Sequence, residues 1–526
     1  MESTNPTEPL SELLRKKPEL LTRYGDAIEG QLRCFDRVIV HGLLVDVCTP
    51  GALANYLLRS GRRPADLEAF ALPLNNQIRD NTILLARQHG VKIEYVQRKN
   101  FRFEDRVAGI LKERGAHPGL VHIFSAKERA TVFETRKSKQ TGHVTLIQRS
   151  GCCVHYYFYL IHEQLGLVYV RVPTWLPFRV QIYLNGHELL ARQLDRQNIA
   201  YEKIDNAFIH IASWARAQAL ADSFEPKQLH RWLDELARTY CPPIEQFPRG
   251  YHWSFMQAEY AWDVVFKDPA TMANLFETLS REAIHTVRAD EVGRFFGKRL
   301  PHGHDTRVDS DLGRRVDSFR LRHHMGPTGL KFYTKHHRIF RLECTTNDVS
   351  FFQHYREVVH NNGTREMKVA AMKKSIYSLE ALRVVMLAAL RRYLEWLGTL
   401  SEHSSAQNEL NRLGESQKDA HQRSHRGFNL LREQERSLFI AILRGEFAAG
   451  GFSNRRLRPL LGGRSPGQVS RLIKRLRVHG LLKRVGRTYR YYVTKLGQKL
   501  CMAALRLHET ITVPTLSAAP TCAPAP

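Results

Sequence analysis

The stretch LKFYTKHHRIFRLECTTND, residues 330 to 348, combines residue types that phosphodiester chemistry requires. Two alternating runs around a short polar turn predict a β-hairpin. Its alternation places six polar side chains on one face, Lys331, Tyr333, Lys335, Arg341, Glu343 and Thr345. The lysines would lower the pKa of a tyrosine nucleophile and hold the phosphate, the arginine would be a second clamp, and the glutamate would act as base or metal ligand. The alternative is a solvated polar sheet face without chemistry.

The spacing Lys-x-Tyr-x-Lys followed by Arg-x-Glu resembles a hairpin of some rolling-circle replication initiators of phages and plasmids. The resemblance covers fewer than twenty residues and implies DNA strand cleavage with Tyr333 as the nucleophile. An aspartate usually precedes the last lysine in that hairpin, and this chain has Thr334 there. The His-hydrophobic-His metal motif of many such enzymes is not evident.

Two further stretches contain residue types that bind divalent metals. MQAEYAWDVVF, residues 256 to 266, lies in a predicted helix over 255–266, where Glu259 and Asp263 would share one face and hold Mg²⁺ or Mn²⁺. Residues 301–315 contain a second group of candidate ligands, His302, His304, Asp305, Asp309 and Asp311. An exposed helix paired with basic neighbours and a solvent-exposed loop are the alternatives.

Aromatic and basic residues gather between residues 155 and 188. Proteins that bind single-stranded nucleic acid use these types to stack bases and to hold phosphates. The residues concerned are Tyr156, Tyr157, Tyr159, Arg171, Trp175 and Arg179. The alternative is that most of these aromatic residues belong to a core.

The stretch SPGQVSRLIKRLRVHGLLKRVGRTYRYYVT, residues 465 to 494, has the clearest local pattern in the chain. Ser465 followed by Pro466 predicts a helix start, and Gly480 predicts its end. Two helices are predicted before it, two short strands after it, and a last helix begins at Thr494. Residues 451 to 500 contain fourteen Lys or Arg and no Asp or Glu, which favours an anionic partner.

This order of elements resembles the MarR-like winged helix-turn-helix domains over about residues 430 to 508. The resemblance implies that the third helix enters the major groove of DNA and that the wing tip contacts a flanking groove or phosphate. The candidate DNA-binding residues are Ser465, Gln468, Arg471, Lys474, Arg475, His479, Arg487 and Arg490. A protein partner, RNA or dimerisation alone are the alternatives for so basic a domain.

The length and charge of the chain limit the number of domains and the kinds of partner that can be expected. A chain of 526 residues exceeds the size of a single core, so two or three domains are expected. The net charge of +27 favours nucleic acid over an anionic membrane surface. Eight cysteines without a Cys-x-x-Cys pair and an N-terminus without a secretion signal predict reduced thiols and a cytoplasmic protein. The apolar run 382–400 contains three arginines and a glutamate, so a packed helix is expected and not a membrane span.

The pattern along the chain predicts a mixed α/β or α+β body followed by a winged helix-turn-helix domain. The predicted parts are a mobile arm at 1–30, a body at 31–400 with one or two subdomains, a polar linker at 401–427, the winged domain at 428–510 and a disordered tail at 511–526. The strand order in the body and a homodimer are left open by the sequence.

The whole chain resembles a large group of uncharacterised bacterial proteins over nearly all of residues 30 to 505. The segments that carry the resemblance are FDRVIVHG, YFYLIHEQLG, TWLPFRVQIYLNGHE and QAEYAWD, with residues 340–344 and the terminal domain. It implies an architecture and no reaction. A P-loop and zinc-ligand spacing are absent, which argues against an ATPase or a zinc finger.

Three classes of function remain. The first is a site-specific DNA-processing protein of a mobile-element or replication type, with a metal-dependent nuclease or strand-transfer activity. The second is a MarR-like transcriptional regulator whose large body senses a ligand or dimerises. The third is an RNA-binding protein. The size of the body favours the first class over the second.

Overall fold

The computed structural model describes residues 17–97, 100–115, 117–298, 308–314, 319–400, 411, 413–429, 432–486 and 488–513. The chain divides into two compact units, residues 1–400 and residues 401–526. The first unit is a mixture of helices and one large sheet, and the second is mainly helical. The mixed α/β class predicted from the sequence is therefore confirmed for the body.

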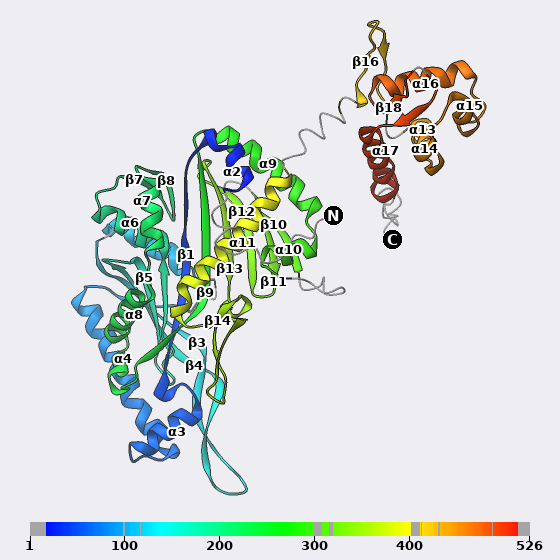
Figure 1. Cartoon of the computed structure of the whole chain (residues 1–526). Helices are drawn as coiled ribbons and strands as arrows, with labels where there is room; N and C mark the ends of the chain where they lie inside the picture. The colour runs from blue at the N-terminus through cyan, green and yellow to red at the C-terminus, as the bar shows by residue number, and fades with distance from the viewer. Residues whose placement is uncertain are drawn as a thin grey trace, which may run out of the picture. The chain divides into compact units, whose positions relative to one another are not determined.

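An eleven-stranded sheet runs through the first unit (Figure 1). Its order is β10 (Val308–Arg314), β11 (Phe319–Met325), β12 (Thr328–Lys335), β13 (Ile339–Thr346), β9 (Tyr251–Phe266), β1 (Ile28–Leu44), β6 (Gln181–Asn185), β5 (Gly166–Pro173), β4 (Val144–His162), β3 (Gly119–Lys137) and β2 (Ile93–Tyr95). All neighbouring pairs are antiparallel except β2 and β3. Strands far apart in sequence, β1, β9 and β13, therefore lie side by side at the centre.

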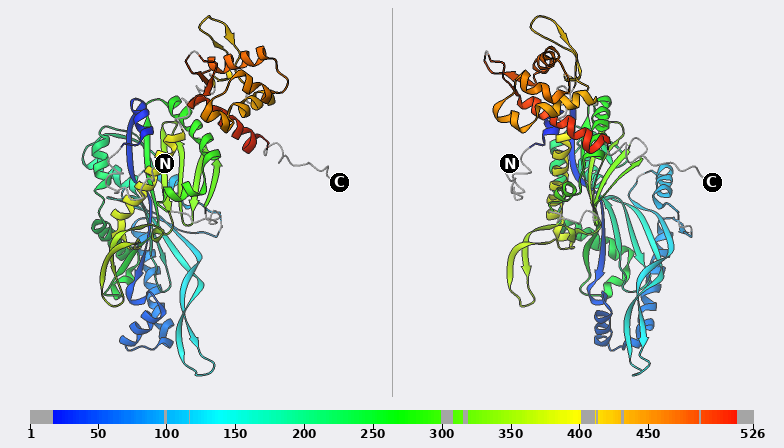
Figure 2. Two further views of the ribbon diagram at one scale, coloured as in Figure 1. Left: turned by 45° about the vertical axis from the view of Figure 1, so that its right-hand side comes forward. Right: turned by 90° about the vertical axis from the view of Figure 1, so that its right-hand side faces the viewer.

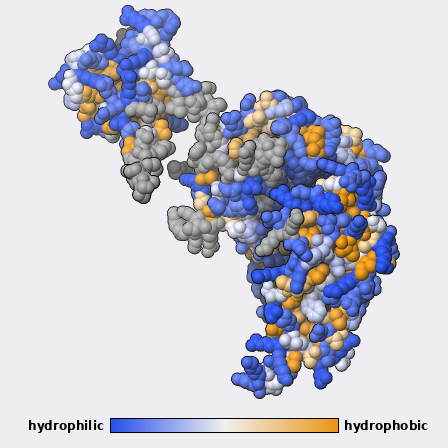
Figure 3. All heavy atoms as spheres, turned by 180° about the vertical axis from the view of Figure 1, so that it is seen from behind, coloured by the Kyte–Doolittle hydropathy of each residue, from blue (hydrophilic) through white to orange (hydrophobic). Residues whose placement is uncertain are grey.

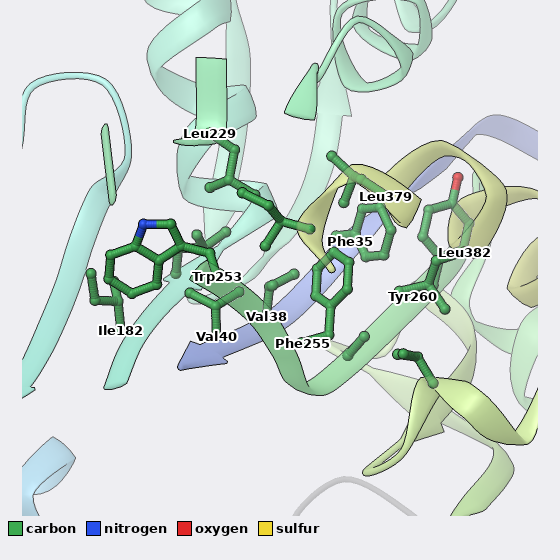
Figure 4. Packing of buried hydrophobic residues seen from close by; sticks show 14 of the residues in the cluster. Phe35, Val38, Val40, Ile182, Leu229, Trp253, Phe255, Tyr260, Leu379 and Leu382 are labelled. Atoms are coloured by element: carbon green, nitrogen blue, oxygen red, sulfur yellow. The ribbon is translucent and has the colours of Figure 1, made fainter. Parts of the chain in front are cut away.

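One face of the sheet carries the main hydrophobic core. The helices that contribute to it are α2 (Glu19–Arg23), α3 (Pro50–Arg59), α4 (Leu67–Gln88), α8 (Pro226–Tyr240), α9 (Pro269–Thr286), α10 (Ala289–Phe295) and α11 (Leu379–Leu400). Figure 4 shows part of this core, with Phe35, Val38 and Val40 of β1 beside Trp253 and Phe255 of β9. Burial of these large apolar side chains fixes the sheet against its helices.

The opposite face is covered only in parts. Helix α5 (Phe103–Arg114) packs on β3 and β4 at one end. Helices α6 (Gly186–Arg196) and α7 (Trp214–Asp222), with the hairpin of β7 (Tyr201–Ile204) and β8 (Ala207–Ile211), pack on apolar residues at the start of β1. Between these two covers the face is polar.

Two β-ribbons project from the first unit (Figure 2). One is formed by the far ends of β3 and β4, which pair through Lys137 and Val144. The other is the separate hairpin of β14 (Gln353–Val359) and β15 (Arg365–Ala371). On the face of the molecule seen in Figure 3, hydrophobic residues are interspersed among hydrophilic ones. Within the described part of the chain, no helix combines the length and apolar character that a membrane crossing needs.

The second unit has its own core. Its elements are β16 (Gln417–Lys418), β17 (Ser424–His425), α13 (Glu433–Ile442), α14 (Gly445–Gly450), α15 (Asn454–Leu457), α16 (Pro466–Val478), β18 (Leu482–Arg484), β19 (Tyr491–Val493) and α17 (Lys495–Leu507). The Ser465 side chain accepts from the backbone N–H of Gln468, and the Gln468 side chain accepts from that of Ser465. This reciprocal cap begins α16 where the sequence predicts it.

The structure moves two predicted boundaries. Leu20 and Leu21 of α2 are buried and β1 begins at Ile28, so residues 17–30 are part of the first unit and not of an arm. Leu413 and Phe428 are buried in the core of the second unit. The described part of the predicted linker therefore packs with that unit. Residues 401–410 and most of the predicted tail lie outside the described residues.

The predicted helix over residues 255–266 is wrong, because these residues form all of β9 except its first four residues. The apolar residues of this segment are mostly aromatic or β-branched, types that suit a central strand buried on one face. Spacing of four residues places two side chains on one face of a strand as well as of a helix. Glu259 and Asp263 therefore still share a face, but it is the polar face of the sheet.

His323 gives the first unit an acid-sensitive contact. Its ring is buried between Ser310 and Tyr393, at 2.8 and 2.9 Å, and burial lowers its pKa to about 4 from 6.5. Between these values the unfolded chain binds a proton that the folded chain does not, so the free energy of unfolding falls as pH drops from 6.5 to 4. Denaturant unfolding across this range should show a weaker pH dependence for His323→Gln. The variant His89→Gln, at an exposed histidine, should keep the parent slope.

Candidate functional site

The hairpin predicted at residues 330–348 is present as β12 and β13. Its register places Lys331 opposite Glu343 and Tyr333 opposite Arg341. The neighbouring strand β9 places Asp263 opposite Arg341. Because directly opposed residues in antiparallel strands point to the same side, these five side chains lie on the polar face of the sheet.

Strand β1 adds a carboxylate to this group. The pairing of β1 with β9 changes register between Phe35 and Val38, so Asp36 and Arg37 together oppose Glu259. An extra residue in one strand bends it and changes the direction of its side chains. Asp36 follows the core residue Phe35, so alternation places it on the polar face, where it is buried among the charged groups, and the bulge returns Val38 to the core side.

Three carboxylates meet at this point. One oxygen each of Asp36, Glu259 and Glu343 lie within 4.8 Å of one another. The Lys331 ammonium contacts Glu343 and is 3.8 Å from Glu259. Three oxygen ligands at such separations are of the type that holds Mg²⁺ or Mn²⁺.

Arg341 is fully buried beside these carboxylates. It donates two hydrogen bonds of 2.6 Å to Asp263 and one of 2.7 Å to the backbone oxygen of Asn206. Its Nη1 atom is 3.6 Å from both Asp36 and Glu343. The guanidinium therefore offsets several negative charges, and its predicted role as a clamp for a phosphate is wrong because none of it is exposed.

Helix α6 brings a histidine to the same place. Asn185 caps the helix by accepting from the backbone N–H of His187 at 2.8 Å. A Cβ atom at Gly186 would lie 2.0 Å from the backbone oxygen of Phe35. Only glycine therefore permits the start of α6 to lie so close to β1, and this approach buries His187.

His187 lies between two carboxylates. Its Nδ1 atom is 3.1 Å from Asp36, and its Nε2 atom is 3.5 Å from Asp263. Burial alone would lower the pKa of His187, but contacts with Cys34, Asp263 and Asp36 raise it well above its ordinary value. Burial alone would raise the pKa of Asp36, but its hydrogen bond with His187 and the charge of Arg341 lower it. The imidazolium and the carboxylates thus stabilise each other's charged forms.

Tyr333 is joined directly to the carboxylate group. Its hydroxyl donates a 2.6 Å hydrogen bond to Glu343, and its side chain is buried. Lys335 contacts the side-chain oxygen of Asn206 in the turn between β7 and β8. Burial and the charge of Arg341 lower the pKa of Lys335 to about 8. Both lysines of the predicted phosphate site therefore contact protein groups in this structure.

Solvent reaches the group from one side. The side chains of Lys331 and Glu259 are 13% and 15% exposed, whereas that of Glu343 is 1% exposed. Burial raises the pKa of Glu259, and the charge of Glu343 adds to this effect although Lys331 opposes it. A ligand or cation would therefore enter past Glu259 and Lys331.

The prediction that Glu259 and Asp263 together hold a metal is wrong, because Asp263 is not in the same ligand group as Glu259. Asp263 accepts hydrogen bonds from Arg341. Burial alone would raise the pKa of Asp263, but Arg341 and His187 lower it. Glu259 groups instead with Asp36 and Glu343. Sequence reasoning missed Asp36, Asn206 and His187, and the only signal for any of them was the acidic residue Asp36 within the apolar run FDRVIVHG.

The acidic stretch at 301–315 forms no separate ligand group among the described residues. Asp309 and Asp311 lie on β10, and Asp311 is 3.1 Å from Arg320 on β11. His302, His304 and Asp305 lie outside the described residues.

The candidate DNA-binding residues of the second unit divide into exposed and buried groups. Arg471 and Arg490 are exposed, and Ser465 and Gln468 form the exposed cap of α16. Lys474 is partly exposed and lies 2.6 Å from Asp419. Arg487 lies outside the described residues.

Two of the predicted DNA contacts are wrong, because Arg475 and His479 are buried. Arg475 binds Glu435 at 3.0 Å, donates to the backbone oxygens of Arg426 and Gly427, and lies 3.8 Å over the ring of Phe428. The periodicity of α16 placed this residue on the polar side, but residues 413–429 pack over it. Arg477, which was not predicted, is exposed on the same helix.

The comparisons with known proteins return no relative. No protein-family model, no curated protein and no solved structure matches the chain. The interpretation of both units therefore rests on their residues and geometry.

Removing Arg475 should destabilise the second unit. Arg475→Ala leaves the buried carboxylate of Glu435 without its closest cation, which typically costs about 3–5 kcal/mol in the free energy of unfolding. Arg477→Ala removes the same charge from an exposed position of the same helix and should change this free energy by less than about 0.5 kcal/mol. Denaturant unfolding of the full chain measures both. Equal stability of the two variants would contradict the structural role of Arg475.

Proposed function

We propose that the protein binds DNA through its second unit and cleaves or transfers a DNA strand at the carboxylate group of its first unit. The observation that carries the proposal is the convergence of Asp36, Glu259 and Glu343 within 4.8 Å, with the Tyr333 hydroxyl bound to Glu343 at 2.6 Å. A nucleophile, a proton acceptor and ligands for a divalent cation meet at one point, although they come from four different strands.

The reaction that this geometry supports is a phosphodiester transfer. The Tyr333 oxygen attacks phosphorus, its proton passes to Glu343, and the bond from phosphorus to one deoxyribose oxygen breaks. The leaving oxygen takes a proton from water, and the products are a strand joined to Tyr333 through a phosphodiester and a strand that ends in a free hydroxyl. Attack by that or another hydroxyl reverses the step, so both cleavage and joining are available without an external energy source.

Asp36, Glu259 and Glu343 would hold Mg²⁺ or Mn²⁺. The cation supplies Lewis-acid stabilisation of the charge on the transferring phosphoryl group. The donor set fits, because all three ligands are carboxylate oxygens, and burial together with the neighbouring Glu343 carboxylate already raises the pKa of Glu259. Lys331 contacts two of these carboxylates and would turn toward the phosphate when a cation binds.

Arg341 and His187 are positioning residues in this mechanism. Both are buried, and both contact Asp36 and Asp263. Their charges keep Asp36 ionised, and ionised carboxylates are the form that binds a metal.

For the second unit we propose a winged helix-turn-helix domain of the MarR-like type. The support is the order of α13, α15, α16, the β18–β19 pair and α17, and the capped start of α16. Arg471 and Arg477 on α16 and Arg490 before β19 are exposed and would contact DNA. The absence of acidic residues between 451 and 500 supports nucleic acid as the partner, and RNA remains the alternative.

A regulator without catalysis is the second candidate, and one observation favours it. Tyr333, Arg341 and Glu343 are 3%, 0% and 1% exposed, so the centre of the charged group is closed to a polymer substrate in this structure. In a regulator the same group would be a buried charge network that holds the sheet together.

The test of catalysis is a comparison of two tyrosine variants. Tyr333→Phe should abolish cleavage and covalent attachment of single-stranded and duplex DNA in Mg²⁺ or Mn²⁺, because it removes only the attacking oxygen. Tyr393→Phe is the matched control, since Tyr393 is also buried and its hydroxyl also binds one side chain, that of His323. Denaturing electrophoresis of end-labelled DNA detects cleaved strands and adducts.

Glu343→Gln and Asp36→Asn extend this test. Both should reduce cleavage at least a hundredfold, since each removes a metal ligand, and added EDTA should have the same effect on the parent. A parent protein that cleaves none of these DNAs with either metal, or a Tyr333→Phe variant as active as Tyr393→Phe, would favour the regulator.

DNA binding is tested separately with the Tyr333→Phe chain. Arg471→Ala should weaken binding to a preferred duplex by about 1–3 kcal/mol, as expected for loss of one base contact. Arg490→Ala should weaken all duplexes alike and reduce the salt slope by about one. Lys499→Ala, which removes an exposed charge from α17, is the control. Fluorescence anisotropy at several salt concentrations measures these effects, and no duplex binding at low salt would contradict the assignment.

A further inference from the structure

The polar face of the sheet contains a second candidate site, a cavity of about 300 Å³ near the ends of β5 and β6. Six of its lining residues carry the argument, namely His41, Arg129, His155, Arg171, Trp175 and Arg179. All of its lining residues lie in the described part of the chain, and none of them is acidic. A volume at the lower end of the range for ligand pockets fits a single small anionic group with its substituent.

Two of the three arginines have unmatched charges. Arg171 is held by Glu128, with contacts of 2.6 and 3.2 Å, and by the hydroxyl of Tyr157 at 2.9 Å. The side chains of Arg129 and Arg179 make no hydrogen bond and no ion pair with the described residues, and the Nε atom of Arg179 is buried without an acceptor. A buried donor without a partner costs free energy, which an anion in the cavity would recover.

Burial and neighbouring cations lower the pKa values of the two histidines that line the cavity. Burial and the charge of Arg171 lower the pKa of His155 to about 4. Burial and the charges of Arg179 and Lys374 lower the pKa of His41. Both rings are therefore uncharged at neutral pH, so they offer hydrogen bonds at the wall of the cavity while the guanidiniums supply the charge.

We propose that this cavity binds a phosphate group of a nucleotide, either free or within a single strand of nucleic acid. Guanidinium groups match the planar arrangement of phosphate oxygens better than ammonium groups do. The flat indole of Trp175 and the apolar side chain of Met256 lie beside them and suit a base or sugar. The aromatic and basic stretch at 155–188 thus contributes Arg171, Trp175 and Arg179 to one place.

The position of the cavity would allow one nucleic-acid strand to run along the sheet from the carboxylate group to the cavity. His41 and Asp36 lie on the same strand, β1, five residues or roughly 16 Å apart. Between them the Arg37 guanidinium lies 5.4 Å from the ring of Tyr183, which stacks on Tyr169 at 5.2 Å. Arginine and aromatic side chains of this kind bind single-stranded nucleic acid, because bases stack on them. Binding at the cavity does not depend on cleavage at the carboxylates.

The test uses the full-length protein in EDTA, where metal-dependent cleavage is absent. Isothermal titration calorimetry measures the binding of three probes, which are inorganic phosphate, dAMP and an oligothymidylate of six nucleotides. The double variant Arg129→Gln/Arg179→Gln should weaken binding of dAMP or of the oligonucleotide at least tenfold. The control Arg59→Gln/Arg231→Gln removes two exposed charges from α3 and α8 and should stay within twofold of the parent.

The three probes distinguish the sources of the phosphate. If dAMP binds and the oligonucleotide displaces it, the cavity is a nucleotide site that also accepts a nucleic-acid strand. If the double variant weakens binding of the oligonucleotide alone, the cavity is a site for a strand and not for a free nucleotide. Arg129→Gln by itself, at an exposed position, should still weaken binding severalfold while thermal unfolding is unchanged. The proposal is overturned if the parent binds none of the probes, or if the double variant binds all of them as tightly as the parent. Neither result bears on cleavage by Tyr333.

Discussion

A buried guanidinium holds the centre of the first unit together. Arg341 is fully buried and forms a two-point contact with Asp263 on the next strand, while Asp36 and Glu343 lie within 3.6 Å. Removing so many charges from water is costly unless each has a partner. The turn between β7 and β8, the capped start of α6 and the bulge in β1 all supply such partners, so the charge network determines where these elements lie.

The same network leaves part of the negative charge at the carboxylate group without a matching cation. Arg341 and His187 between them neutralise Asp36 and Asp263. Glu259 lies beside the Lys331 ammonium, and Glu343 lies beside the same ammonium and 3.6 Å from Arg341. A cation between the last two carboxylates would complete the balance, and a tyrosine hydroxyl already lies at hydrogen-bond distance from one of them. A structural ion network normally has no need of a partly exposed edge, and this edge is where chemistry is proposed.

Positive charge has different roles in different parts of this chain. On α16, Arg475 stabilises the second unit from inside, and Arg471 and Arg477 remain available to a polyanion. On the sheet, Arg171 is matched by Glu128, and Arg129 and Arg179 are not matched among the described residues. The net charge of +27 already counts each paired arginine against its acidic partner, so the excess comes from the lysines and arginines that outnumber the carboxylates.

The sequence alone determined the local elements and one face of the site. Alternation predicted the β12–β13 hairpin with Tyr333 and Glu343 on one side, and cap residues predicted the start of α16, because both depend on neighbours in the chain. Tertiary structure alone decided that β9 lies beside this hairpin and β1 beside β9, that Asp36 is buried among the charged groups of this face, and that Arg341 and Arg475 are buried. Pairing between distant strands and burial of long side chains depend on which segments meet in space, and local periodicity carries no information about that.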